Sequence, residues 1–272
     1  MTERAAGPGV IARTLSAQGA RVIGFVRHAG AAALLAARAV RSLFTTRFEG
    51  RSFVYQLEQL GVRSFGIAAA TAIFVGIVMA IQFAFSLERF GAKDSVGRIV
   101  GLSMVRELAP SLTSLVVGSR IAAGIAAELG SMAVTEQIDA IRALGADPVK
   151  KLVLPRVLAG TVLMPLLSLF AIVLGVGSAM IVCRVTFGIP MPFFLSSALD
   201  TVDLADFLSG IGKTPVFGFL ICLLGCHFGM ITRGGTEGVG RSTTTAVVVT
   251  SIAILVANAI LTQLFLSIIG AS

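Results

Sequence analysis

Charged residues are scarce in this sequence. Lys, Arg, Asp and Glu make up 13% of the 272 residues, whereas 56% are hydrophobic and the mean hydropathy is +0.93. A water-soluble domain of this length cannot cover so much apolar surface with so few charges. The composition therefore excludes an ordinary soluble protein and is typical of an integral membrane protein.

Cysteine and histidine are also few, with three and two residues. Cys183, Cys222 and Cys226 lie in apolar runs, where free cysteine behaves as a small hydrophobe. Cys222, Cys226 and His227 have no further metal-type ligand near them in sequence, so we expect helix packing there and no metal site.

A phosphate-binding loop of the Walker type is missing. The closest approach, GIGKT at Gly210 to Thr214, would need glycine where Phe207 stands. Lys213 also marks the start of a predicted span, on the side where ATP is not available. We therefore expect that this chain is not an enzyme and does not hydrolyse ATP by itself.

Lysine and arginine are absent from residues 186–208, which instead contain Asp200, Asp203 and Asp206. Nine of the 22 basic residues lie in residues 1–63. Because cytoplasmic loops carry the excess of Lys and Arg, the N-terminus is predicted to be cytoplasmic and, after five spans, the C-terminus lies on the far side. Topology and anionic headgroups explain the net charge of +8, so nucleic acid is not an expected partner.

Five apolar stretches are long enough to cross a bilayer, which takes about 20 residues. The stretch from about Ile11 to Phe44 differs, because arginines interrupt it, and it reads as a basic amphipathic helix lying along the interface. We expect an all-α integral membrane protein with this interfacial helix in a cytoplasmic region 1–63 and a membrane domain 64–272. The predicted spans are residues 65–87, 99–127, 157–183, 214–232 and 243–269.

A polar segment, ELGSMAVTEQIDAIRALGADPVKKLVLPRVLAG from Glu128 to Gly160, separates the second and third spans. A short helix is predicted over residues 135–144. Thr135 would cap its N-terminus, and Gly145 and Pro148 would end it. It would rise only about 15 Å, too little to span the bilayer. Either it connects two spans or it docks a cytoplasmic partner. Its apolar stripe would be Val134, Ile138, Ile141 and Leu144, with Glu136, Asp139 and Arg142 on the other side.

Three charges, Arg106, Glu107 and Arg120, lie inside the second predicted span. Each costs at least about 2.5–3.5 kcal/mol in a membrane, so they should face protein or water. Helical spacing places Arg106, Thr113 and Arg120 near one face. One interpretation is that Arg106 and Glu107 satisfy each other and nearby backbone. The other is that Arg106 binds an anionic lipid phosphate while Glu107 orients it.

Small residues recur in two spans and predict close helix packing. In the second span they follow the four-residue spacing of one helix face. The residues are Gly118, Ser119, Ala122, Ala123 and Ala127 in the second span and Gly175, Gly177 and Ser178 in the third.

The polar segment and its neighbours carry a resemblance. MVRELAPSLTSLVVGSR, followed by the segment from Glu128 to Gly160, resembles the signature of the MlaE (YrbE) family of ABC-transporter permeases. GTEGVGRSTTTAVVVTSI resembles that family's segment before the last span. The resemblance covers nearly everything from about Phe65 to the end, so residues 64–272 would form an MlaE-type permease domain.

This resemblance implies a homodimeric, non-catalytic subunit in the bacterial inner membrane, with its N-terminus cytoplasmic and its C-terminus periplasmic. Its partners would be a cytoplasmic ABC ATPase, which holds the ATP and Mg²⁺, and a periplasmic MCE-domain lipid-binding protein. A small STAS-domain protein bound to the ATPase is a further partner that the family admits. The complex would move phospholipids between the inner membrane and the outer envelope.

The resemblance also assigns roles to residues, although ordinary packing stays an alternative for each apolar one. Arg106 and Glu107 would face a lipid pocket with Leu108, Leu87, Phe90 and Met79 as its apolar wall. The helix 135–144 would couple the ATPase to the spans. Its coupling residues would be Thr135, Glu136, Gln137, Ile138, Asp139, Ile141, Arg142 and Leu144.

Two other functions compete with this one. A self-contained secondary transporter or channel could use Arg106, Glu107 and Arg120 as an ion path, but five spans without an inverted repeat weaken that hypothesis. A membrane anchor that only scaffolds its partners is disfavoured by the charges inside the second span.

Overall fold

A computed structural model of the chain describes residues 10–45 and 50–269. These residues form helices joined by short connections, and no strand occurs among them. The expected all-α class is thereby confirmed. The helices are α1 (Val10–Thr45), α2 (Gly50–Glu88), α3 (Val96–Ser103), α4 (Ala109–Val134), α5 (Gln137–Ala143), α6 (Leu154–Phe187), α7 (Met191–Leu199), α8 (Leu204–Met230) and α9 (Gly235–Ile269).

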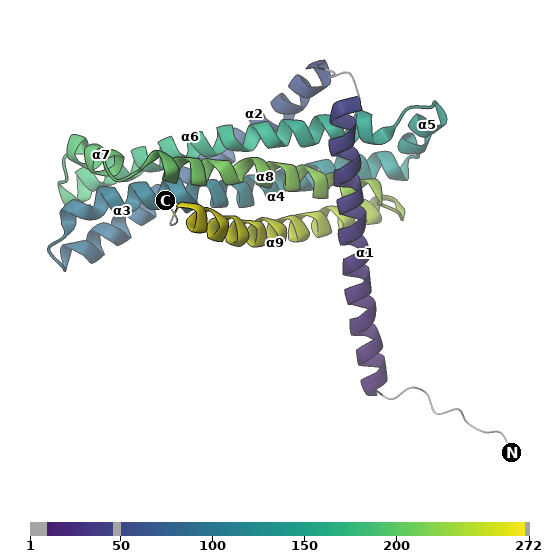
Figure 1. Cartoon of the computed structure of the whole chain (residues 1–272), viewed down its shortest axis with the longest axis horizontal. Helices are drawn as coiled ribbons and strands as arrows, with labels where there is room; N and C mark the ends of the chain where they lie inside the picture. The colour runs from purple at the N-terminus through teal and green to yellow at the C-terminus, as the bar shows by residue number, and fades with distance from the viewer. Residues whose placement is uncertain (1–9, 46–49, 270–272) are drawn as a thin grey trace.

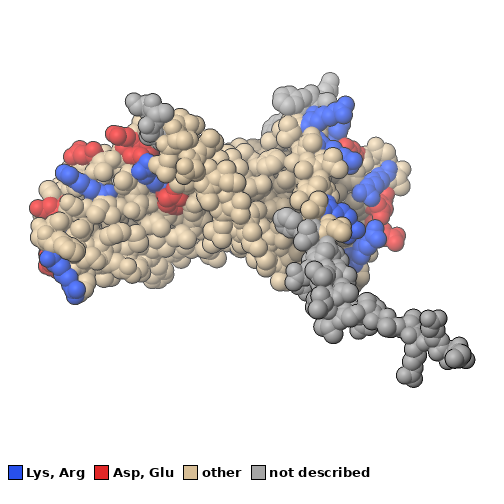
Figure 2. All heavy atoms as spheres, turned by 60° about the horizontal axis from the view of Figure 1, so that its bottom comes forward, with Lys and Arg blue, Asp and Glu red and all other residues tan. Residues whose placement is uncertain are grey.

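Among the described residues, five helical stretches are long and apolar enough to cross a membrane, which agrees with the expected number. They run side by side along the long axis of the molecule (Figure 1). On the face shown in Figure 2, the charged side chains gather toward the two ends of this axis and leave an uncharged belt between them. The stretches are Gly50–Glu88, Lys93–Val134, Val149–Phe187, Leu204–Met230 and Gly235–Ile268.

Helix α1 crosses the other long helices near one end (Figure 1) and packs on α6 and α8. Ala32, Ala39 and Ser42 are buried in that contact, whereas Val26 and Leu34 are largely exposed. A helix that lies across the spans and leaves apolar side chains uncovered suits the plane of a membrane interface. Its interfacial position stays a prediction.

Small residues bring the spans into close contact, as predicted. A methyl group added to Gly76 of α2 would overlap the Gly175 carbonyl oxygen of α6, and Ser178 Oγ donates a hydrogen bond to the Ile73 carbonyl at 3.1 Å. Gly118 of α4 packs in the same way against Ile221 of α8. Gly177 has open space around it, so it is not part of such a contact.

Two spans contain a π-helical turn, η2 (Met104–Leu108) and η3 (Val149–Val153). Each is followed two residues later by a proline, Pro110 or Pro155. A proline ring clashes with the carbonyl group four residues earlier, and the wider turn relieves that clash. Neither turn is predicted by the sequence pattern.

Some boundaries differ from the expected ones. The predicted division between residues 63 and 64 falls inside the continuous helix α2. Helix α8 begins at Leu204, ten residues before the predicted fourth span, because Asp203 and Asp206 form a capping box there. Lys213, interpreted from the sequence as the charge at the start of that span, lies within α8.

Candidate functional site

The π-helical turn η2 lies in the second span and contains Arg106 and Glu107. Within this turn the Ala109 amide donates to the Met104 carbonyl, five residues earlier. Pro110 has no amide hydrogen to give to the Arg106 carbonyl, which would be its partner in an α-helix. The turn therefore frees a backbone acceptor next to two charged side chains, an arrangement that often marks functional sites.

Lys213 of α8 donates to this free carbonyl and to two side chains beside it. Its Nζ donates to Glu107 Oε1 at 2.6 Å, to Thr262 Oγ1 at 2.8 Å and to the Arg106 carbonyl at 3.3 Å. The ammonium carries three N–H donors, so these three acceptors satisfy it. The Lys213 side chain is only 1% exposed, and its charge is tolerated at that depth because it is paired and fully hydrogen-bonded.

Glu107 also accepts two hydrogen bonds from α9. Thr262 Oγ1 of α9 donates to Oε1 at 2.9 Å, and Asn258 Nδ2 of the same helix donates to Oε2 at 3.1 Å. One carboxylate thus joins η2, α8 and α9. Because its side chain is 38% exposed, the centre is not sealed.

Arg106 has a different partner from Glu107. Its Nε lies 3.0 Å from Asp206 Oδ1 in the first turn of α8, and its side chain is 29% exposed. One sequence interpretation had Arg106 and Glu107 satisfy each other, and the other had Glu107 orient Arg106 toward a lipid phosphate. In the structure each of the two residues forms its ion pair with α8. Adjacent residues on a helix point in directions about 100° apart, so they cannot face each other.

The predicted apolar wall is only partly assembled around this centre. Leu87 and Leu108 both pack against one buried core cluster at this end of the bundle. Met79 is half-buried, whereas Phe90 is 82% exposed in the turn after α2. The structure brings Leu87 and Leu108 to the same region and leaves Phe90 outside the core.

Arg120 lies further along the second span than Arg106, toward its other end, and forms a hydrogen bond with a different helix. Its Nη1 donates to Ser64 Oγ of α2 at 2.8 Å, whereas Arg106 contacts α8. Thr113, between them in sequence, is buried. The three residues predicted to share a polar face therefore do not act as one contact surface.

The short helix predicted over residues 135–144 is observed as α5, which is shorter than expected, and its coupling role stays a prediction. Thr135 does not cap it: its Oγ1 donates to the Ser131 carbonyl at 2.8 Å and so belongs to the last turn of α4. Glu136 follows with a φ of 59° and takes the position before the helix. Gly145, with a φ of 76°, ends the segment as predicted.

The surface of α5 is largely uncovered, at the end of the bundle opposite α7 (Figure 1). Ile138 is buried and Ile141 half-buried, but Leu144 is 86% exposed. Asp139 Oδ1 accepts a hydrogen bond from Arg142 Nη1 at 2.7 Å on the outer side. The remaining predicted coupling residues, Thr135, Glu136 and Gln137, are exposed as well.

A third ion pair links the two ends of the polar segment. Arg156 Nη2 of α6 lies 2.6 Å from Glu128 Oε1 of α4, and its Nη1 donates to the Leu152 carbonyl at 2.7 Å. The Arg156 side chain is 4% exposed. This pair connects the second span to the third, at the end of the bundle that carries α5.

Sequence reasoning missed Asp206, Lys213, Thr262 and Arg156 as members of these centres. A usable signal existed for the first two, because charges within apolar helices must find partners and α8 carries one of each sign. The pairing itself could not be derived, since it depends on how helices distant in sequence are arranged.

Comparisons with known proteins agree with this architecture. Residues 53–264 match the family described as Permease MlaE. The chain is 38% identical over 250 residues to a probable ABC transporter permease protein of Rickettsia felis, covering 92% of this chain and 96% of the relative. A probable ABC transporter permease protein of Synechocystis is 39% identical over 218 residues, covering 80% of this chain and 83% of the relative. The chloroplastic protein TRIGALACTOSYLDIACYLGLYCEROL 1 of Arabidopsis thaliana is 37% identical over 232 residues, 85% of this chain and 66% of the plant protein.

Proposed function

The chain belongs to the MlaE family of ABC transporter permeases, and from this premise we propose that it is the membrane subunit through which an ATPase moves phospholipids between the inner membrane and the outer envelope. The chain itself is proposed to be non-catalytic, with ATP and Mg²⁺ bound by the partner ATPase.

The observation that carries the proposal is the different chemistry of the two ends of the bundle. One end presents α5, an uncovered helix with a charged outer side. The other end contains Arg106, a partly exposed guanidinium beside the core to which Leu87 and Leu108 contribute. A docking surface at one end and an amphipathic site at the other are what a lipid permease driven by an external motor requires.

Arg106 suits the phosphate of a lipid. Its ion pair with Asp206 uses Nε, and a guanidinium has five N–H donors, so donors remain for a phosphate oxygen. Glu107 is proposed to act through Lys213, because its carboxylate holds the lysine whose Nζ bonds the Arg106 carbonyl. Leu108, Leu87, Met79 and Phe90 would accompany the acyl chains.

Lipid as the substrate class is supported by one relative's name. The plant relative is named for trigalactosyldiacylglycerol, a diacylglycerol lipid. We extend that class to this chain and propose a phospholipid because Arg106 offers a positive charge rather than a sugar-binding surface.

The partners follow from the same premise. We propose a cytoplasmic ABC ATPase docked on α5 through its exposed residues, a periplasmic MCE-domain protein at the opposite end, and a homodimer in the bacterial inner membrane. A small STAS-domain protein would bind the ATPase and not this chain. The N-terminus would be cytoplasmic and the C-terminus periplasmic. No nucleic-acid partner is proposed.

The test is mass spectrometry of proteins and lipids on the tagged chain, purified from its native membranes in mild detergent. The proposal expects a P-loop ATPase, an MCE-domain protein and bound phospholipid to be recovered with it. Recovery of the chain alone from an otherwise intact preparation would overturn the ABC assignment and favour ion-coupled transport through Arg106 and Glu107.

A further inference from the structure

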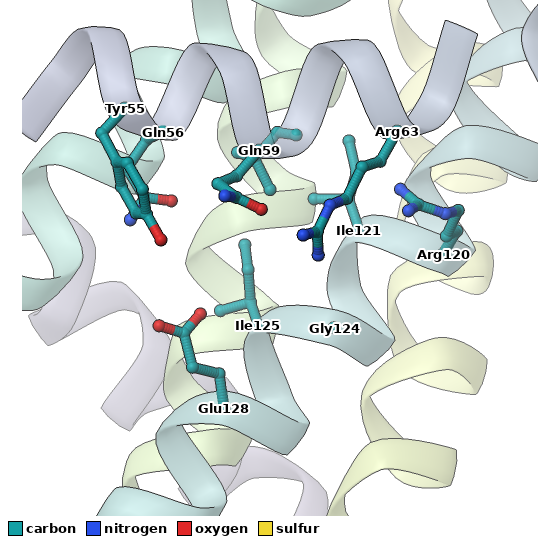
Figure 3. Close-up of a pocket in the computed structure, with 10 residues that line it drawn as sticks. Tyr55, Gln56, Gln59, Arg63, Arg120, Ile121, Gly124, Ile125 and Glu128 are labelled. Carbon is teal, nitrogen blue, oxygen red and sulfur yellow. The ribbon is translucent and has the colours of Figure 1, made fainter. Parts of the chain in front are cut away.

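A polar cavity lies between α2 and α4, at the end of the bundle that carries α5. Its volume is 480 Å³, within the range of about 300–1,000 Å³ that small-molecule sites occupy. Figure 3 shows Tyr55, Gln59 and Arg63 of α2 directed toward Arg120 and Glu128 of α4 across this space. Leu60, Ile121 and Ile125 supply the apolar part of the lining.

The charges in this cavity are unbalanced. Arg63 has no hydrogen bond or ion pair with another residue in the described ranges 10–45 and 50–269, and Arg120 contacts only the neutral Ser64 through Nη1. Glu128 lies on the other side of the cavity, and its charge is neutralised by Arg156 at 2.6 Å. Two uncompensated guanidinium groups from two helices therefore line one space.

Neutral hydrogen-bonding groups complete the lining. In Figure 3 the Tyr55 hydroxyl and the Gln59 amide point into the same space as the Arg63 guanidinium, and Gln56 lies beside them. Hydroxyl, amide and guanidinium groups are the donors that proteins use for phosphate oxygens. A cation would find only Glu128 there, which is already paired.

The depth of the cavity matches the headgroups of one leaflet. Arg63 stands two residues before the uncharged run from Phe65 to Leu87, which as a helix is about 34 Å long, close to the hydrocarbon thickness of about 30 Å. Along η2 and α4, Arg120 lies about 21 Å from Arg106. The two arginines of the cavity thus sit near one boundary of the apolar belt, and Arg106 lies toward the other.

We propose that this cavity binds a phosphate group near the cytoplasmic surface, clamped by Arg63 and Arg120, with Tyr55 and Gln59 donating further hydrogen bonds. The phosphate belongs either to a phospholipid of the inner leaflet or to a soluble phosphate compound. If it belongs to a lipid, the chain has one headgroup site for each leaflet, and this reading rests on the proposed phospholipid transport.

A neighbouring cavity supports anion binding at this position. It has a volume of 320 Å³, shares Tyr55 and Gln56 with the first, and adds Arg51 and Lys151, both exposed. These cations extend the positive charge outward from Arg63 and would attract anions toward the site.

The experiment uses a tryptophan reporter, because the chain contains no tryptophan. The full-length Tyr55→Trp chain in maltoside detergent is titrated with water-soluble dihexanoyl phosphatidylglycerol and, separately, with inorganic phosphate, while tryptophan emission is followed. We expect saturable binding that Arg63→Gln weakens about tenfold, from the loss of one charge-assisted contact. Arg38→Gln removes an equal charge from the exposed side of α1 and should change the affinity less than about twofold.

The two titrations separate the sources of the phosphate. Saturation by phosphatidylglycerol that inorganic phosphate does not displace identifies a lipid site, whereas saturation by inorganic phosphate alone identifies a soluble anion. Absence of saturation by either, or equal effects of Arg63→Gln and Arg38→Gln, overturns the site. Native mass spectrometry of the chain with Tyr55 retained gives the same comparison without the reporter. Neither measurement needs ATP or a partner, so failure of binding and failure of transport are distinguished.

Discussion

Lys213 Nζ lies 2.6 Å from Glu107 Oε1 across 106 positions of sequence. The pair closes a network that contains Thr262, Asn258 and the Arg106 carbonyl. It therefore fixes α8 and α9 against the turn that carries Arg106. Stability and lipid handling should both depend on it.

Glu107→Ala should destabilise the protein, because it leaves the buried Lys213 ammonium without its carboxylate partner. Removing one partner of a buried pair costs about 3–5 kcal/mol, and the 38% exposure of Glu107 places this case toward the lower value. The measurement is the thermal unfolding midpoint of the purified chain in detergent.

The control for this prediction is Glu237→Ala, which breaks the exposed pair with Arg241 and should cost at most about 1 kcal/mol. The double variant Glu107→Ala, Lys213→Met removes both charges and should recover much of the loss. A double variant no more stable than Glu107→Ala alone would show that the pair is not what holds these helices.

Arg106→Ala should lower phospholipid transport about tenfold while the complex keeps its normal abundance, since one charge-assisted contact to phosphate is lost. Arg106→Lys should retain only part of the transport activity, because an ammonium cannot bind a phosphate bidentately. Arg98→Ala, an exposed cation of α3, serves as the control. Full transport by Arg106→Ala would refute the role of Arg106 in lipid binding.

The sequence predicted these charges but not their partners. Five apolar runs specify five spans because a bilayer leaves little choice for about 20 apolar residues, and Gly145 ends α5 because glycine tolerates a φ of 76°. In contrast, the interpretations paired Arg106 with Glu107, which are adjacent in sequence and point apart on a helix. The pairs Arg106–Asp206 and Glu107–Lys213 depend on how α8 packs against the second span at glycines and on the π turn. No local sequence pattern specifies how these two helices are aligned.

Reversing charge on α5 with Glu136→Lys and Asp139→Lys should release the ATPase or uncouple ATP hydrolysis from transport. Both side chains are exposed, so the fold should be unaffected. Co-purification of the ATPase and its lipid-stimulated hydrolysis are the two measurements. As a control, Asp94→Lys reverses the charge of one exposed residue at the other end of the bundle. Unchanged association and transport in the α5 variant would count against docking there.

Gly76→Ala should lower the free energy of unfolding by about 1–3 kcal/mol, because the new methyl group would overlap the Gly175 carbonyl and force α2 away from α6. Gly66 on the same helix has open space around it, so Gly66→Ala should be neutral or stabilise by up to about 1 kcal/mol. Thermal unfolding of both variants measures the difference. Equal midpoints would mean that the two helices do not approach as described.

The central claim, ATP-driven phospholipid movement, is tested most directly by reconstituting the chain with the proposed ATPase and MCE-domain partners in vesicles and following a fluorescent phospholipid. The account predicts transfer that requires ATP and magnesium and that falls about tenfold with Arg106→Ala. Transfer that proceeds without ATP and follows an imposed ion gradient would contradict it and identify a secondary transporter.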